Sequence, residues 1–232
     1  MNKQKHIRIL LSLMTLSAFI SCNSAKEKTV FFPKDYLFPI DQIGSGKTFV
    51  YSNVEAMNQT SYKDLKLITE SGVKIILSKQ YSNEEKFDSS KTSVDNKLIE
   101  TFTFMSPDNS KIGHHPIKGE IIEERVFESR LKFGERISTI SYSGKENVVT
   151  IKSEEKYLKD TILTWQGSQL SCIVIRRKST IGFYSKIIPI AKQELKYNGD
   201  SYYAKGIGLI RYTTQTKKNF STWELIEIKD TK

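Results

Sequence analysis

The sequence has little of what stabilises small secreted scaffolds or builds metal sites. Its 232 residues include two cysteines, three histidines and two tryptophans. Two cysteines are too few for a disulfide framework, so the hydrophobic core has to hold the fold together. His114 and His115, the only histidines beyond residue 6, are too few for a structural zinc site or a hydrolytic triad unless they sit close to other suitable residues. We expect this pair to lie in a surface loop.

Long hydrophobic runs are also missing. The apolar stretch at residues 9–20 is shorter than the roughly 20 residues that a helix needs to cross a bilayer. Lys3, Lys5 and Arg8 precede it, and a basic segment followed by a short apolar one is typical of a secretory signal. We therefore expect residues 1–21 to be a signal peptide.

The apolar stretch ends in Phe19, Ile20, Ser21 and Cys22. This segment resembles the lipobox of bacterial lipoproteins, although Leu is commoner at the position of Phe19 and a small residue at that of Ile20. The resemblance implies a diacylglycerol thioether on Cys22, cleavage before Cys22, and acylation of the new N-terminus, for instance with palmitate. Ordinary signal cleavage is the alternative, and Phe19 disfavours it because a small residue is needed there.

A lipid on Cys22 would make residues 22–29 a tether and residues 30–232 a single domain. Three acyl chains hold a protein at a membrane far more firmly than one. The seven residues after Cys22 reach at most about 25 Å, so the domain should stay near the bilayer. The residues after Cys22 are Asn23 and Ser24, and neither is an aspartate of the kind that retains some lipoproteins in the inner membrane. This favours delivery to the outer membrane, on its periplasmic or surface face.

The formal net charge is +10, and it stays positive after loss of the signal. The basic residues are dispersed and no nucleic-acid-binding motif accompanies them, so nucleic acid is not an expected partner. A basic surface can instead attract anionic lipid head groups or other envelope polyanions. Cys172, in an apolar segment, is expected to be a small buried side chain.

Segments rich in β-branched and aromatic residues recur from residue 47 onward. The predicted strands are residues 47–55, 64–69, 73–81, 98–105, 117–127, 136–142, 147–153, 170–177, 182–190, 193–197, 201–204, 208–213 and 221–228. Asn198 and Gly199 give the strongest signal for a two-residue hairpin turn. Residues 170–175 place apolar side chains on both faces of an extended chain, which predicts a strand covered on both sides. Short helices are open alternatives at residues 82–96 and 154–164.

So many strands exceed the roughly ten that one twisted open sheet holds comfortably. We predict a mainly β fold, an antiparallel meander curled into a half-barrel or barrel, or split into a sandwich, with few short helices. Residues 38–40, 46–51 and 203–212 resemble a pattern of uncharacterised envelope lipoproteins. That resemblance implies a sheet similar to the unclosed barrel of lipoprotein carriers of the LolA and LolB type.

The candidate catalytic motifs are incomplete. Gly44, Gly46, Lys47 and Thr48 suggest a phosphate-binding loop, but the first glycine of that motif is replaced by Asp41 and a strand follows, so a turn is expected. Adjacent carboxylates face opposite sides of a strand, which favours solvated side chains over an acid–base pair. The adjacent carboxylates are Glu84 and Glu85, Glu123 and Glu124, and Glu154 and Glu155.

We therefore expect no cofactor, no metal and no enzymatic activity. The 11 tyrosines and 12 phenylalanines could either fill the core or line a concave face that binds an acyl chain or another hydrophobic ligand. The resulting hypothesis is an envelope lipoprotein that binds a lipid, a hydrophobic ligand or a protein partner on a curved sheet. A structural or adhesive module that contacts polyanions is the alternative, and a hydrolase using carboxylates distant in sequence is a third.

Overall fold

The computed structural model describes residues 36, 40–82, 85–109, 111–127, 133–188 and 192–231. The predicted signal peptide, Cys22 and the tether lie outside the described residues, so those predictions stand as they were. Within the described ranges, no helix is long and apolar enough to cross a membrane.

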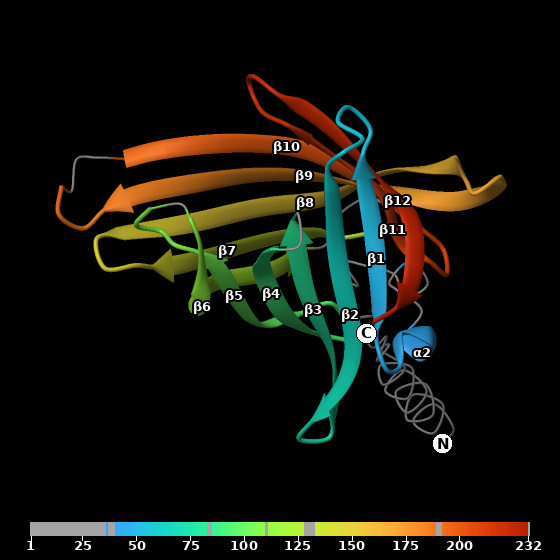
Figure 1. Cartoon of the computed structure of the whole chain (residues 1–232), viewed down its shortest axis with the longest axis horizontal. Helices are drawn as coiled ribbons and strands as arrows, with labels where there is room; N and C mark the ends of the chain where they lie inside the picture. The colour runs from blue at the N-terminus through green and yellow to red at the C-terminus, as the bar shows by residue number, and fades with distance from the viewer. Residues whose placement is uncertain are drawn as a thin grey trace, which may run out of the picture.

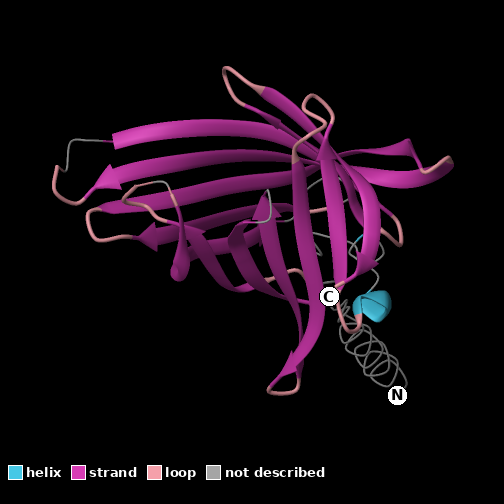
Figure 2. Cartoon of the chain, viewed as in Figure 1, coloured by secondary structure: helices cyan, strands magenta, loops and turns pink. Residues whose placement is uncertain are grey.

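The described chain forms a closed antiparallel β-barrel (Figures 1 and 2). Each strand pairs with the next one along the chain, and the first strand pairs with the last. The elements are α2 (Ile40–Ile43), β1 (Lys47–Asn53), β2 (Thr60–Glu70), β3 (Val73–Ser82), β4 (Glu85–Ser93), β5 (Leu98–Met105), β6 (Ile112–Phe127), β7 (Glu135–Ser143), β8 (Asn147–Trp165), β9 (Ser168–Ser185), β10 (Lys192–Ala204), β11 (Gly208–Gln215) and β12 (Phe220–Asp230).

The predicted meander is confirmed, and the barrel is the form it takes. The half-barrel that the resemblance implied, and the sandwich, are not formed, because β1 and β12 pair along their length from Lys47 opposite Asp230 to Asn53 opposite Trp223. This pairing satisfies the backbone groups that an open edge would expose. It also encloses a lumen.

Both alternative helices are wrong. Residues 85–93 form β4, and residues 154–164 belong to the long strand β8. Each of these segments is paired along both sides, which fixes an extended backbone whatever the local preference. Their hydrophobic alternation is weak because polar side chains occupy the lumen face as well as the outer face, for example Asp88 and Ser90 in β4.

The strand β9 lies in the barrel wall between β8 and β10 and is covered on both sides at residues 172–175, as predicted. Cys172, Ile173, Val174 and Ile175 are all buried, and Cys172 is 1% exposed. Cys172 belongs to a core cluster with Phe49 of β1, whereas Ile173 and Ile175 pack on the other face of the strand with Tyr157 of β8. The prediction of a buried Cys172 is therefore confirmed.

Gln166 and Gly167, both with a positive φ, form the turn of a hairpin of β8 and β9 that extends beyond the neighbouring strands (Figure 1). The tip of this hairpin is bound to β12. The indole Nε1 of Trp165 donates a hydrogen bond of 2.6 Å to the Leu225 carbonyl, and the Gln166 amide donates one of 3.3 Å to the Ile226 carbonyl. This overhang is therefore fastened to the barrel wall.

The hairpin predicted at Asn198 and Gly199 is wrong. Both residues lie within β10, where Asn198 pairs with Lys178 and Gly199 pairs with Arg177, and the turn to β11 comes later, at Gly206. Gly199 does not use a positive φ. Its role is a close approach, because a Cβ atom there would lie 2.0 Å from the Thr213 carbonyl oxygen of β11.

Replacing Gly199 with Ala is expected to lower the free energy of unfolding by about 1–3 kcal/mol, the usual range for an added group that forces the backbone apart. Urea unfolding followed by circular dichroism measures this. Gly113→Ala is the matched control, since the nearest atom to its added Cβ would be 3.7 Å away. Equal stability of the two variants would contradict a close approach at Gly199.

Candidate functional site

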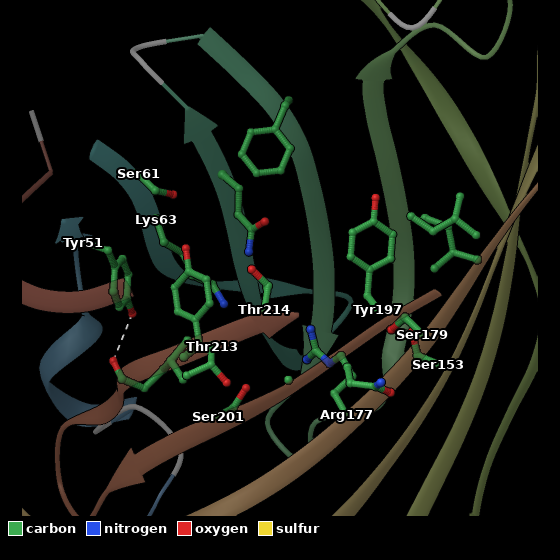
Figure 3. A pocket seen from close by; sticks show the side chains of 18 of the residues that line it. Tyr51, Ser61, Lys63, Ser153, Arg177, Ser179, Tyr197, Ser201, Thr213 and Thr214 are labelled. Atoms are coloured by element: carbon green, nitrogen blue, oxygen red, sulfur yellow. Dashed lines mark hydrogen bonds between the residues drawn. The ribbon is translucent and has the colours of Figure 1, made fainter. Parts of the chain in front are cut away.

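A cavity of about 520 Å³ lies within the barrel (Figure 3). Its walls come from β1 to β4 on one side and from β8 to β11 on the other, so side chains far apart in sequence face the same space. The lining residues are Tyr51, Ser61, Lys63, Gln80, Phe87, Ile151, Ser153, Arg177, Ser179, Ile181, Tyr197, Asn198, Gly199, Ser201, Tyr203, Leu209, Tyr212, Thr213 and Thr214.

Aromatic and aliphatic side chains form much of this wall. Tyr51 meets Tyr212 edge to face, with ring centroids 5.6 Å apart, and its hydroxyl donates a 3.0 Å hydrogen bond to the Leu209 carbonyl (Figure 3). Burial raises the pKa of Tyr212 to about 12 and that of Tyr51 well above its usual value. These phenols therefore stay uncharged and present both apolar ring surface and a hydroxyl.

Small hydroxyl residues occupy the positions between the rings. The Oγ atoms of Ser153 in β8 and Ser179 in β9 lie 3.0 Å apart in a directly opposed pair. Ser61, Ser201 and Thr213 add further hydroxyls to the wall. A hydroxyl can donate or accept a hydrogen bond, so this wall can meet a polar ligand atom of either kind.

Two cations, Lys63 and Arg177, are the charged side chains on the cavity wall. They approach from opposite sides, because β2 and β9 are separated by several strands in both directions around the barrel. Burial lowers the pKa of Lys63 to about 8, and the positive charge of Arg177 lowers it in the same direction. Lys63 is thus held where a positive charge is costly, whereas the charge of Glu155 raises the pKa of Arg177.

A buried carboxylate balances the arginine. Glu155 is 5% exposed and lies between Arg136 and Arg177, directly opposite both in the strand register. The Nε atoms of Arg136 and Arg177 donate to separate oxygens of Glu155, at 2.8 Å and 2.6 Å. Burial alone would raise the pKa of Glu155, but the charges of Arg177 and Arg136 lower it to about 2.

Asp88 of β4 stands in one row with Gln80 and Lys63, on neighbouring strands and on the same face. Its Oδ1 is buried and has no hydrogen-bond partner in the described part of the chain. Burial raises the pKa of Asp88 to about 7, and the charge of Lys63 opposes that rise. Asp88 can therefore change its charge near neutral pH.

Among the described residues, none of the candidate motifs from the sequence, the histidine pair, the Gly44–Thr48 segment and the adjacent glutamates, lines this cavity. His115 is exposed in β6, so the predicted loop at the histidine pair is wrong and a strand takes its place. Gly44 and Gly46 form the expected turn, with positive φ angles, between α2 and β1. Within the described ranges, no three His, Cys, Asp or Glu side chains are grouped to hold a metal ion.

The carboxylate pairs divide between two environments. Glu154 is exposed and lies 3.3 Å from Lys152, as expected of a solvated side chain, whereas the same expectation for its neighbour Glu155 is wrong. Glu123 pairs with Arg125, and Glu124 accepts a hydrogen bond of 3.0 Å from the Leu98 amide. Glu85 is exposed, and Glu84 lies outside the described residues.

The comparisons with known proteins concern the fold. No family model matches the chain, and no curated protein does. Similar solved structures include a candidate lipoprotein of Parabacteroides distasonis, with 16% identity and a TM-score of 0.44, and a candidate exported protein of Bacteroides fragilis with a YmcC-like fold, with 10% identity and a TM-score of 0.49. Each alignment covers 88% of this chain and all of the other.

Proposed function

We propose that this protein is a lipid-anchored, non-enzymatic component of the bacterial cell envelope that binds a small amphipathic ligand inside its barrel. The observation that carries the proposal is the lumen cavity with its mixed wall. Ligand sites in proteins are typically concave spaces of about 300–1,000 Å³, mostly apolar with a few placed polar groups, and the cavity of about 520 Å³ has this character.

A binding role is favoured over hydrolysis by the placement of the carboxylates. A glycosidase-type mechanism needs two carboxyl groups that face one space. The charged groups on this cavity wall are instead Lys63 and Arg177, and the nearby Glu155 is engaged by two arginines. The wall is therefore suited to hold a ligand.

The envelope location is supported by residues 1–21 and Cys22, which have the pattern of an export signal and a lipidation site. Delivery to the outer membrane, on its periplasmic or surface face, is the finer proposal. A protein partner bound by the barrel is compatible with this location, since a partner could supply the ligand or receive it.

Filling the cavity tests the proposed binding. Ser179→Phe places a ring in the lumen, and it is expected to weaken binding of the uncharged fluorophore N-phenyl-1-naphthylamine by about tenfold or more, the effect of losing roughly 1.4 kcal/mol of apolar contact. Fluorescence titration of the purified protein measures the change.

Thr180→Phe is the matched control, because Thr180 is the next residue of β9 and points to the other face of the strand. It should bind the probe as the unchanged protein does. If the unchanged protein does not bind the probe and carries no ligand in native mass spectrometry, lumen binding is refuted.

The alternative function is contact with polyanions through the outer wall. Lys152, Lys178 and Lys196 lie on three neighbouring strands, β8, β9 and β10, around a shallow outer depression. Binding of heparin or dextran sulfate to this face should fall steeply as salt rises, because exposed charges are screened. Ligand binding in the lumen should persist at the same salt concentration.

A further inference from the structure

The described lining residues of the cavity include two positively charged side chains and no carboxylate. Lys63 and Arg177 line the cavity, whereas Glu155 and Asp88, which neighbour them in the strand register, do not. The cavity can therefore favour a negatively charged ligand, because the ligand directly contacts the two cations on the wall. This holds although the nearby carboxylates nearly balance the buried positive charges.

Arg177 keeps part of its hydrogen-bonding capacity for a ligand. Its Nε and Nη2 both engage one oxygen of Glu155, at 2.6 Å and 2.5 Å. No residue in the described ranges accepts a hydrogen bond from its Nη1. The side chain is 49% exposed although Glu155 beneath it is buried, so the guanidinium is oriented by the protein and open to the cavity.

Lys63 projects into the same space from the opposite wall (Figure 3). The two cations act on each other, since the charge of Arg177 helps to lower the pKa of Lys63. A negative group placed between them would be attracted by both and would relieve that repulsion. Ser153, Ser179 and Ser201 supply hydroxyls on the wall that can donate to further oxygens.

We infer that the ligand is an amphiphile with an anionic oxygen head group, a carboxylate or a phosphate, held between Lys63 and Arg177 while its apolar body lies against the rings of Tyr51 and Tyr212. This inference rests on the proposed function and specifies the ligand class for the same cavity. A charged head group bound by an oriented guanidinium forms stronger hydrogen bonds than a neutral one.

Binding of such an anion depends on pH in a defined direction. Asp88, whose pKa is about 7, gains negative charge as the pH rises, and Lys63, whose pKa is about 8, loses positive charge over the next range. Both changes weaken anion binding, so affinity is highest below pH 7 and falls towards pH 9. The other titratable groups on or behind these walls are Arg136, Arg177, Glu155, Tyr51, Tyr142, Tyr197, Tyr203 and Tyr212. The raised pKa values of Tyr51, Tyr142, Tyr203 and Tyr212 keep these phenols neutral over this range, and the raised pKa of Arg177 and the lowered pKa of Glu155 keep that pair charged.

Displacement of N-phenyl-1-naphthylamine by chains of equal length tests the head group. Decanoate and decyl phosphate are expected to displace the probe at concentrations about tenfold or more below those of decanol and decyltrimethylammonium at pH 6. The relative strength of decanoate and decyl phosphate decides between the two oxyanions. The advantage of decanoate over decanol should shrink as the pH is raised to 9, because the charge of decanoate is constant over this range. Decyl phosphate is compared at pH 6 alone, since it gains a second negative charge above its second pKa of about 6.

Lys63→Met removes one cation while keeping an unbranched side chain, and it should reduce the advantage of decanoate over decanol to about threefold or less. Lys79→Met is the matched control, because Lys79 pairs with Asp64, the residue after Lys63, and so lies on the outer face. It should leave the advantage unchanged. The ranking of the four amphiphiles on the unchanged protein needs no variant, so it decides the matter even if Lys63→Met does not fold.

The failures of the two proposals are distinct. If decanol, decanoate and decyl phosphate displace the probe equally, the anionic head group is refuted and lumen binding stands. A preference for decyltrimethylammonium would refute it as well. If the probe does not bind and no amphiphile is retained, the proposed function itself fails.

Discussion

Glu155→Gln is expected to lower the free energy of unfolding by about 3–5 kcal/mol at pH 7, the usual effect of removing one partner from a buried charge cluster. Glu155 is 5% exposed and accepts hydrogen bonds from Arg136 and Arg177 on the two neighbouring strands. The neutral amide leaves two guanidinium groups without their shared counter-charge. It also weakens the cross-strand contact that joins β7, β8 and β9.

Glu154→Gln is the control, since Glu154 is exposed on the same strand and lies 3.3 Å from Lys152. A surface change of this kind usually alters stability by no more than about 0.5 kcal/mol. Urea unfolding of both variants gives the comparison. Equal midpoints for Glu155→Gln and the unchanged protein would show that the cluster contributes nothing to stability.

Acid should reduce the difference between Glu155→Gln and the unchanged protein. The pKa of Glu155 is about 2 in the folded state, below the ordinary value of 4.5 that applies to the unfolded chain. Its ionised form therefore stabilises the fold fully above pH 4.5, and that contribution is lost as the pH falls towards 2. Repeating the urea experiment at pH 7, 4 and 2.5 measures this loss.

The antiparallel order of the strands could be predicted because, in most of the chain, segments with a local strand pattern follow one another and each pairs with the next in the barrel. The apolar residues 170–175 showed a strand covered on both faces, and its two core clusters lie where that pattern required. The polar segment of β4 could not be assigned in the same way. Its lumen-facing Asp88 and Ser90 are as hydrophilic as its outer residues, so no period of two marks it.

The site was largely invisible in the sequence because barrel closure creates it. Lys63 and Arg177 belong to strands that meet only across the lumen, and nothing in their local surroundings distinguishes them from surface cations. Glu154 and Glu155 show how little adjacency reveals, since one strand position separates an exposed carboxylate from a buried one. Alternation states that they face opposite sides, but the register decides which side is the lumen.

Asn198 and Gly199 show the reverse error, a strong local signal overridden by the fold. The pair favours a type I′ turn in an isolated hairpin. In the barrel, β10 continues through it because β9 pairs with all of residues 192–204, and the glycine instead permits the approach of β11. A glycine in a strand can thus mark a crowded backbone contact as well as a turn.

Cys22→Ser is expected to move the protein from the membrane fraction to the soluble fraction almost completely. The change removes the sulfur that would carry the diacylglycerol, and each buried CH₂ of an acyl chain contributes about 0.8 kcal/mol to membrane binding. Cys172→Ala is the control: Cys172 is 1% exposed in the core, so this variant should stay with the membrane. Ultracentrifugation, detergent phase partition and labelling with a palmitate analogue measure the outcome. Membrane retention of Cys22→Ser, or label on Cys172, would refute a lipid anchor at Cys22.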